Sequence, residues 1–212
     1  MPDYKVEVRN VNKRFKETLA LNDVSIEFER GKIHGIIGRN GSGKTVLLKC
    51  ICGYMRPDSG DILIDKKRVV PSAAQDIGVI VEYPGFIDSM SGYQNLTMLA
   101  AIKGKISKQD VRRAIERVGL SPDLRKAVRK YSLGMRHRLG IAQAIMENPP
   151  LLILDEPMNG LDKQGVSEVR EVFKSLSEEG CTIILTSHYV EDIEVLCHTV
   201  SEMDGGILQR IR

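Results

Sequence analysis

Apolar and polar residues along this chain recur with two different periods, which predict two kinds of element. Short apolar or alternating runs are typical of β-strands. In the first run, Val6 and Val8 share one face and Lys5, Glu7 and Arg9 share the other, so we expect a half-buried strand with its charged side chains on the outer face. The predicted strands cover residues 4–9, 25–29, 33–37, 61–65, 77–81, 151–154 and 182–186, with a hairpin turn at 66–67 and a terminal β-hairpin around 204–206.

Apolar residues at helical spacing fall between these strands. We expect Ser107 to cap a helix that ends at Gly119, and Ser132 to cap a later one. The stretch from about 89 to 147 carries helical patterns only, so it is expected to form a helical insert in an α/β chain. Strands that alternate with helices predict a mainly parallel sheet, with ligands at the carboxyl ends of its strands. Further helices are predicted at 46–51, 166–176 and 190–197.

Residues 38–45 read GRNGSGKT, which matches the phosphate-binding pattern G-x-x-x-x-G-K-[ST]. A predicted strand precedes the loop and a predicted helix follows it, as the motif requires. Glycines let backbone N–H groups face phosphate oxygens, and the following helix directs its positive end to the same place. Lys44 is expected to reach the β- and γ-phosphates, and the Thr45 hydroxyl to coordinate Mg²⁺. A glycine-rich turn with an incidental lysine is the alternative, which the matching flanks disfavour.

A pair of carboxylates follows the apolar strand at 151–154. Asp155 occupies the place where a nucleoside triphosphatase with this phosphate loop holds Mg²⁺. Its neighbour Glu156 points to the other side of the strand end, so it is free to reach an attacking water. Such a pair is unspecific by itself, but together with the phosphate loop it predicts a catalytic role.

Composition limits the remaining classes. The chain has 212 residues, a net charge of +3 and 28% charged residues, so we expect no nucleic-acid partner. No apolar run is long enough to cross a bilayer and the N-terminus lacks a signal-peptide profile, which predicts a soluble, cytosolic protein. Four cysteines form no C-x-x-C pair or zinc spacing, so reduced and mostly buried thiols are expected.

Five motifs in order resemble the nucleotide-binding subunit of ABC transporters over essentially the whole chain. Besides the phosphate loop, YSLGM at 131–135 stands where that family has its LSGGQ signature, and RHRL at 136–139 continues it. LDEP at 154–157 matches the second nucleotide motif, NGLD at 159–162 resembles the D-loop, and TSH at 186–188 resembles the switch histidine. The implied fold is α/β, a P-loop ABC-type ATPase with a RecA-like core, a small antiparallel β subdomain and a helical subdomain. A single domain would then comprise a core at 1–88 and 148–212 and a helical subdomain at about 89–147.

Phe15 is a candidate for contact with the base of the nucleotide. It lies in a polar, basic stretch, where an aromatic ring either stacks on a base or tucks back onto the core. The residues alone leave both alternatives open. In the family an aromatic residue at this place stacks on adenine, so the resemblance favours stacking.

The resemblance further implies that two copies sandwich two ATP molecules head to tail. Ser132 and the Gly134 N–H would contact the γ-phosphate of the ATP bound to the partner copy. His188 would contact the γ-phosphate and orient the water and Glu156. The alternative for His188 is an ordinary core histidine. Loss of that phosphate would separate the halves and drive movement. Catalytic roles are implied for Glu156, His188 and Lys44, and metal ligation for Thr45, Glu82 and Asp155. The residues expected to contact ATP are Phe15, Gly38, Asn40, Gly41, Ser42, Gly43, Lys44, Thr45, Val46, Glu82, Ser132, Gly134 and Asp162.

Three positions depart from the family pattern. Glu82 stands where the family usually has Gln, and Leu133 and Met135 replace Gly and Gln. Glu keeps an oxygen ligand, adds charge and loses the amide donor, so we hypothesise a Mg²⁺ and pH dependence different from that of Gln; a plain surface Glu is the alternative. Leu133 cannot adopt positive φ cheaply, so either the loop does not need it or its shape is altered. These substitutions resemble the branch that exports bacitracin and lantibiotic-type peptides.

A separate integral-membrane permease is the partner that the resemblance implies, which places the protein peripherally on the inner face of the membrane. Tyr83, Phe86 and Tyr93 are candidate contacts for it, with ordinary packing as an equal alternative. Non-transport relatives in translation, chromosome maintenance or iron–sulfur assembly form a second functional class, but tandem domains and a long coiled coil are missing here. A nucleotide-gated structural protein that hydrolyses poorly is disfavoured by the intact catalytic residues. The cargo is chosen by the permease and is not encoded here.

Overall fold

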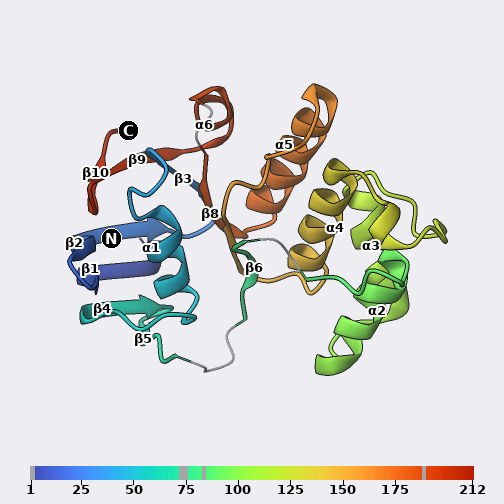
Figure 1. Cartoon of the computed structure of the whole chain (residues 1–212), viewed down its shortest axis with the longest axis horizontal. Coiled ribbons are helices and arrows are strands. Elements are labelled where there is room, and N and C mark those ends of the chain that lie inside the picture. The colour runs from blue at the N-terminus through green and yellow to red at the C-terminus, as the bar shows by residue number, and fades with distance from the viewer. Residues whose placement is uncertain (1–2, 72–75, 83–84, 188–189) are drawn as a thin grey trace.

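The computed structural model describes residues 3–71, 76–82, 85–187 and 190–212, which form two sheets and a group of helices (Figure 1). The first sheet is antiparallel, with strand order β2-β1-β4-β5. Its β4–β5 turn contains Asp65 and Lys66, both at positive φ, so the hairpin expected at 66–67 is confirmed. All four strands lie in the first third of the chain. Its strands are β1 (Tyr4–Phe15), β2 (Thr18–Glu29), β4 (Ser59–Ile64) and β5 (Lys67–Arg68).

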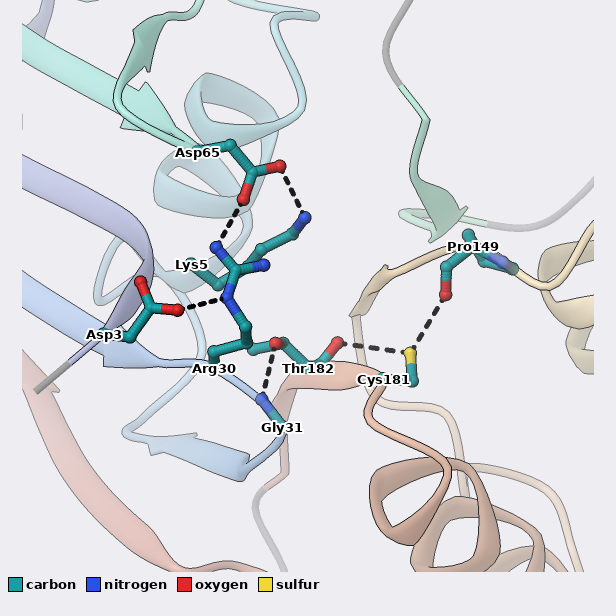
Figure 2. Close-up of polar contacts among 8 residues, drawn as sticks. All are labelled: Asp3, Lys5, Arg30, Gly31, Asp65, Pro149, Cys181 and Thr182. Carbon is teal, nitrogen blue, oxygen red and sulfur yellow. Dashed lines mark hydrogen bonds and ion pairs between the residues drawn. The ribbon is translucent and has the colours of Figure 1, made fainter.

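Lys5 corrects the expectation of a fully polar outer face on β1. Its side chain is buried and its ammonium lies 2.6 Å from Asp65 Oδ2. Arg30 donates to the other oxygen of Asp65 and to Asp3, each at 2.7 Å (Figure 2). The register of β1 shifts between Tyr4 and Val6, so the simple alternation does not hold at Lys5. The turn after β4 brings a carboxylate to it, and a paired lysine is tolerated in a buried position where a lone one is not.

The second sheet has six strands in the order β10-β9-β3-β8-β7-β6. The five strands from β9 to β6 are parallel, and only β10 runs antiparallel. Every residue of β7 and β8 is buried, in keeping with their continuous apolar sequence. The strands are β3 (Ile33–Ile37), β6 (Gly78–Ile80), β7 (Leu151–Leu154), β8 (Thr182–Thr186), β9 (Thr199–Asp204) and β10 (Ile207–Arg210).

Helices complete two hydrophobic cores. One core lies around α1 and joins the antiparallel sheet to the parallel one. The other core joins the parallel sheet to α2, α3, α4 and α5. Helices α2, α3 and α4 lie together at one end of the molecule (Figure 1). Side chains of Ser107, Ser132 and Asp162 cap three of these helices, so the two predicted serine caps are confirmed. The helices are α1 (Lys44–Ile51), α2 (Gly92–Lys103), α3 (Lys108–Arg117), α4 (Leu133–Ile145), α5 (Lys163–Glu178) and α6 (Val190–Leu196), with a 3-10 turn at Val128–Lys130.

All four cysteines are buried and lie outside any disulfide, as the sequence predicts. Cys181 lies at the entry to β8, where its thiol donates to Pro149 O (Figure 2). The next residue, Thr182, accepts a hydrogen bond from Gly31 N–H at 2.9 Å. This contact ties the start of β8 to the turn that leads into β3.

Candidate nucleotide and metal site

The phosphate loop joins β3 to α1 and is held tightly between its neighbours. Gly38 and Gly43 both have positive φ, at 148° and 114°. A Cβ at Gly38 would lie 2.2 Å from Met203 O, and one at Gly43 would lie 2.4 Å from Ala20 O. Backbone conformation and space therefore both demand glycine at these two positions.

The inside of this loop has groups suited to an anion. Ser42 Oγ is buried and, among the described residues, has no hydrogen-bond partner. Lys44 is 6% exposed and its ammonium turns back to donate to Gly38 O at 2.7 Å and Arg39 O at 3.1 Å. A buried hydroxyl, a buried ammonium and the N-terminus of α1 converge here, so the loop fits a phosphate chain.

Strand order brings the second nucleotide motif to the phosphate loop. Because β3, β8, β7 and β6 are consecutive parallel neighbours, their carboxyl ends share one edge of the sheet. Thr45 Oγ1 donates to Asp155 Oδ2 at 2.6 Å across 110 residues of sequence. The hydroxyl and carboxylate oxygens predicted to hold Mg²⁺ are thus already in contact, and oxygen donors of this kind are what Mg²⁺ requires.

Thr186, at the end of β8, organises both carboxylates and was not among the predicted site residues. Its hydroxyl donates to Asp155 Oδ1 at 2.6 Å and accepts from Glu156 N–H at 2.9 Å. Glu156 adopts φ 51°, a left-handed conformation that is uncommon outside glycine. A hydroxyl residue at the end of the strand beside Asp155 was the available signal, and only the strand order gave it meaning.

A cavity of about 160 Å³ lies beside these groups. Glu82, Asp155 and Glu156 all contribute to its wall, and so does His137 from α4. Burial lowers the pKa of His137, which favours its neutral form. His137 belongs to the RHRL stretch that follows the signature and had no predicted role. His188, the predicted switch residue, lies outside the described residues.

Glu82 sits at the end of β6 and adopts φ 67°. Its carboxylate forms an ion pair with Lys49 of α1, with Nζ and Oε1 2.5 Å apart. Glu82 borders the cavity but is largely exposed, so its metal role stays a prediction beside the alternative of a plain surface glutamate.

The other predicted site residues lie on separate elements. Phe15 ends β1 with 43% of its surface exposed and the Lys13 ammonium 5.6 Å from its ring centre, so it does not tuck onto the core. Asp162 accepts from Gly165 N–H at 2.8 Å and is thereby used as a helix cap. Phe86 and Tyr93 pack against the helical core, and Tyr83 is outside the described residues.

The signature region begins α4. Ser132 accepts from Met135 N–H at 3.2 Å, and Leu133 is the first helical residue, so this loop does not need a positive φ there. Within the described part of the chain, no hydrogen bond or ion pair joins Ser132 or Gly134 to residues 38–45. Within one copy, the signature residues are therefore not bonded to the phosphate loop of the same chain.

The glycine loop with Lys44, facing Asp155 and Glu156 at the edge of a parallel sheet, defines a P-loop nucleotide-binding ATPase. Comparison with protein families makes the class more specific. The chain belongs to the ABC transporter family, whose model matches residues 21–159. It is an ATP-binding subunit and an ATPase of that family, which confirms the resemblance carried by the five motifs.

Two curated relatives show the branch to which the chain is similar. It is 41% identical to the bacitracin transport ATP-binding protein BcrA of Enterococcus faecalis, over 97% of this chain and 68% of that protein. It is 35% identical to the lantibiotic transport ATP-binding protein SrtF of Streptococcus pyogenes, over 95% of this chain and 87% of that protein. The alternative of a non-transport ABC ATPase is not favoured by these relatives.

Solved structures confirm the fold. MJ0796, a bacterial ABC transporter cassette solved as a dimer, superposes with a TM-score of 0.88 at 22% identity and covers 98% of this chain and 99% of its own. Within the described ranges, no helix is both long and apolar enough to cross a membrane.

Proposed function

We propose that this protein is the ATP-hydrolysing subunit that drives export of a peptide antibiotic or drug-like molecule through a separate membrane permease. The names of BcrA and SrtF, which refer to bacitracin and lantibiotic transport, support this cargo class. In this proposal the protein is cytoplasmic and lies on the inner face of the membrane through its permease. The core comprises 1–88 and 148–212, and the helical subdomain comprises about 89–147.

Binding begins with the phosphate loop. Lys44 exchanges its two loop carbonyls for the β- and γ-phosphates, and Ser42 supplies a hydroxyl that has no hydrogen-bond partner in the described part of the chain. The loop N–H groups and the N-terminus of α1 hold the remaining phosphate charge. Phe15 stacks on adenine, a role that its exposed ring at the end of β1 supports.

Hydrolysis depends on the carboxylates at the edge of the sheet. Thr45, Glu82 and Asp155 would hold Mg²⁺, which when bound would neutralise charge on the phosphates. Thr186 fixes Glu156 through its N–H, so that the Glu156 carboxylate can accept a proton from the attacking water. His188 orients that water.

A second copy completes the site. Ser132, Gly134 and Asp162 of one copy face the ATP held by the loop of the other. Within the described ranges, no hydrogen bond or ion pair joins Ser132 or Gly134 to residues 38–45 of their own chain, which supports this arrangement. The dimeric form of MJ0796 supports this arrangement. Removal of the γ-phosphate would then open the dimer and move the permease.

The single observation that carries the proposal is the contact of Thr45 with Asp155, with Thr186 linking Asp155 to Glu156. We expect Glu156→Gln to bind ATP, to lose at least 10²-fold of turnover and to form a stable dimer with ATP, because the base is removed while the binding groups remain. Size-exclusion chromatography and phosphate release measure these effects. A Glu171→Gln variant, which neutralises a carboxylate on α5, is the control. A Glu156→Gln protein that turns over normally and stays monomeric would count against the mechanism.

The Glu82 substitution gives this branch a testable property. We expect the ATPase activity of Glu82→Gln, measured with the permease present, to show a different Mg²⁺ and pH profile from the natural protein. Superimposable profiles would remove the special role of Glu82. Phe86 and Tyr93 are proposed to contact the permease through the parts of their side chains that remain exposed.

A further inference from the structure

Lys49 links the phosphate-loop helix to the end of β6. It lies in the last turn of α1, the helix that starts with Lys44 and Thr45. Its ammonium is 2.5 Å from Glu82 Oε1. The left-handed backbone at Glu82, with φ 67°, sets the direction in which this side chain leaves the strand.

The charges around the cavity explain why such a cation matters. Glu82, Asp155 and Glu156 place three carboxylates on one small cavity, and no lysine or arginine is among the described residues of its wall. Like charges so close together repel one another unless a cation is present. Lys49 approaches Glu82 from outside the cavity and supplies that cation.

We propose that Lys49 is a positioning residue that competes with the divalent cation for Glu82. This inference rests on the proposed metal role of Glu82. With no metal bound, the carboxylate is held by Lys49; when the metal enters, Glu82 exchanges the ammonium for the cation. Lys49 thereby sets how much Mg²⁺ is needed to complete the site.

The effect of Lys49 on metal binding should depend on the charge at position 82. A glutamine at position 82 carries no charge, so Lys49 would lose its ion-pair partner and its influence on metal binding through that side chain. The Lys49 side chain is 26% exposed and that of Glu82 is 68% exposed, so screening by solvent limits the effect. We therefore expect a change of roughly two- to fivefold in metal affinity, the range that a partly exposed ion pair supports.

The test uses the full chain with AMP-PNP and measures bound Mn²⁺ by electron paramagnetic resonance. We expect Lys49→Met to tighten Mn²⁺ binding about two- to fivefold. Lys49→Arg, which keeps the charge, should bind Mn²⁺ like the natural protein. Lys174→Met is the matched control, since it removes a lysine that pairs with Glu171 on α5. In the Glu82→Gln background, Lys49→Met should have no effect.

Equal tightening in both backgrounds would show that Lys49 acts only through its general field, and unchanged or weaker Mn²⁺ binding would also overturn the inference. A thermal-unfolding double-mutant cycle in protein free of nucleotide and metal tests the pair directly. Absence of coupling there overturns the inference and leaves the proposed function intact. Unchanged Mn²⁺ affinity in Glu82→Ala, which removes the oxygen ligand, instead overturns the metal role of Glu82, and this inference with it.

Discussion

Replacement of Thr186 by valine tests the arrangement of the two catalytic carboxylates. Valine has nearly the shape of threonine, so the buried end of β8 keeps its packing while the hydroxyl is lost. Two hydrogen bonds disappear, the one donated to Asp155 and the one accepted from Glu156 N–H. The perturbation is therefore polar and leaves the volume unchanged.

The magnitude follows from these two bonds. A hydrogen bond to a charged acceptor contributes about 1.5–3 kcal/mol and a neutral one about 1 kcal/mol. Because Asp155 is only half buried and keeps Thr45 as a donor, we expect a loss of about 2–3 kcal/mol in the free energy of unfolding. For a chain of this size that lowers Tm by roughly 4–12 °C. Displacement of Glu156 should lower kcat about 10- to 100-fold, since small misplacements of reacting groups are costly.

Thr182→Val is the matched control because Thr182 lies at the other end of the same strand and is equally buried. Its hydroxyl accepts only the Gly31 N–H among the described contacts, so about 1–2 kcal/mol of stability should be lost. Its kcat should stay within about twofold of the natural value. Urea denaturation and phosphate release measure the two properties for both variants.

Two results would refute the reasoning. If Thr186→Val keeps its kcat, the hydroxyl does not position Glu156. If Thr182→Val loses as much kcat as Thr186→Val, the loss reflects general weakening of β8 and not the geometry of the site. Nucleotide affinity measured on the same samples separates both cases from a failure to bind ATP.

Three further predictions concern other parts of the chain. Phe15→Ala should weaken ATP binding about 2- to 10-fold with little loss of stability, while Phe15→Trp should restore binding; equal affinities in fluorescence titrations would exclude stacking. Burial lowers the pKa of His34 to about 4, so the unfolded chain binds more protons between about pH 4 and 6.5 and stability falls as the pH drops through that window. Urea denaturation at pH 5 and 7.5 should show this fall, and His34→Gln should flatten it. Burial raises the pKa of Cys50 to about 11 and of Cys52 and Cys181 to about 12, so the native protein should react with DTNB only after denaturation, and rapid reaction at pH 8 would contradict their burial.

The secondary-structure elements and the class of site can be predicted from the sequence alone. Burial imposes a period of two on strands and 3.6 on helices, so the pattern places most elements within a few residues. The loop at 38–45 is recognised by its own residue pattern and by the positive φ of Gly38 and Gly43, although the contacts that exclude a Cβ there come from Met203 and Ala20. The terminal hairpin and the caps at Ser107 and Ser132 are local in the same sense. The length of β1 and β2 was underestimated, since the later residues of β1 and the earlier residues of β2 do not alternate cleanly.

Which side chains contact one another depends on the tertiary structure. Strand order places β8 between β3 and β7, and this alone brings Thr186 to Asp155. The partners of Lys5 and Lys49 come from turns and strand ends 60 and 33 residues away, and no local pattern specifies them. Side-chain hydrogen bonds and ion pairs depend on distances of a few ångströms between elements, whereas periodicity reports only which face of an element is buried. The sequence therefore identifies the phosphate loop, and the fold decides what surrounds it.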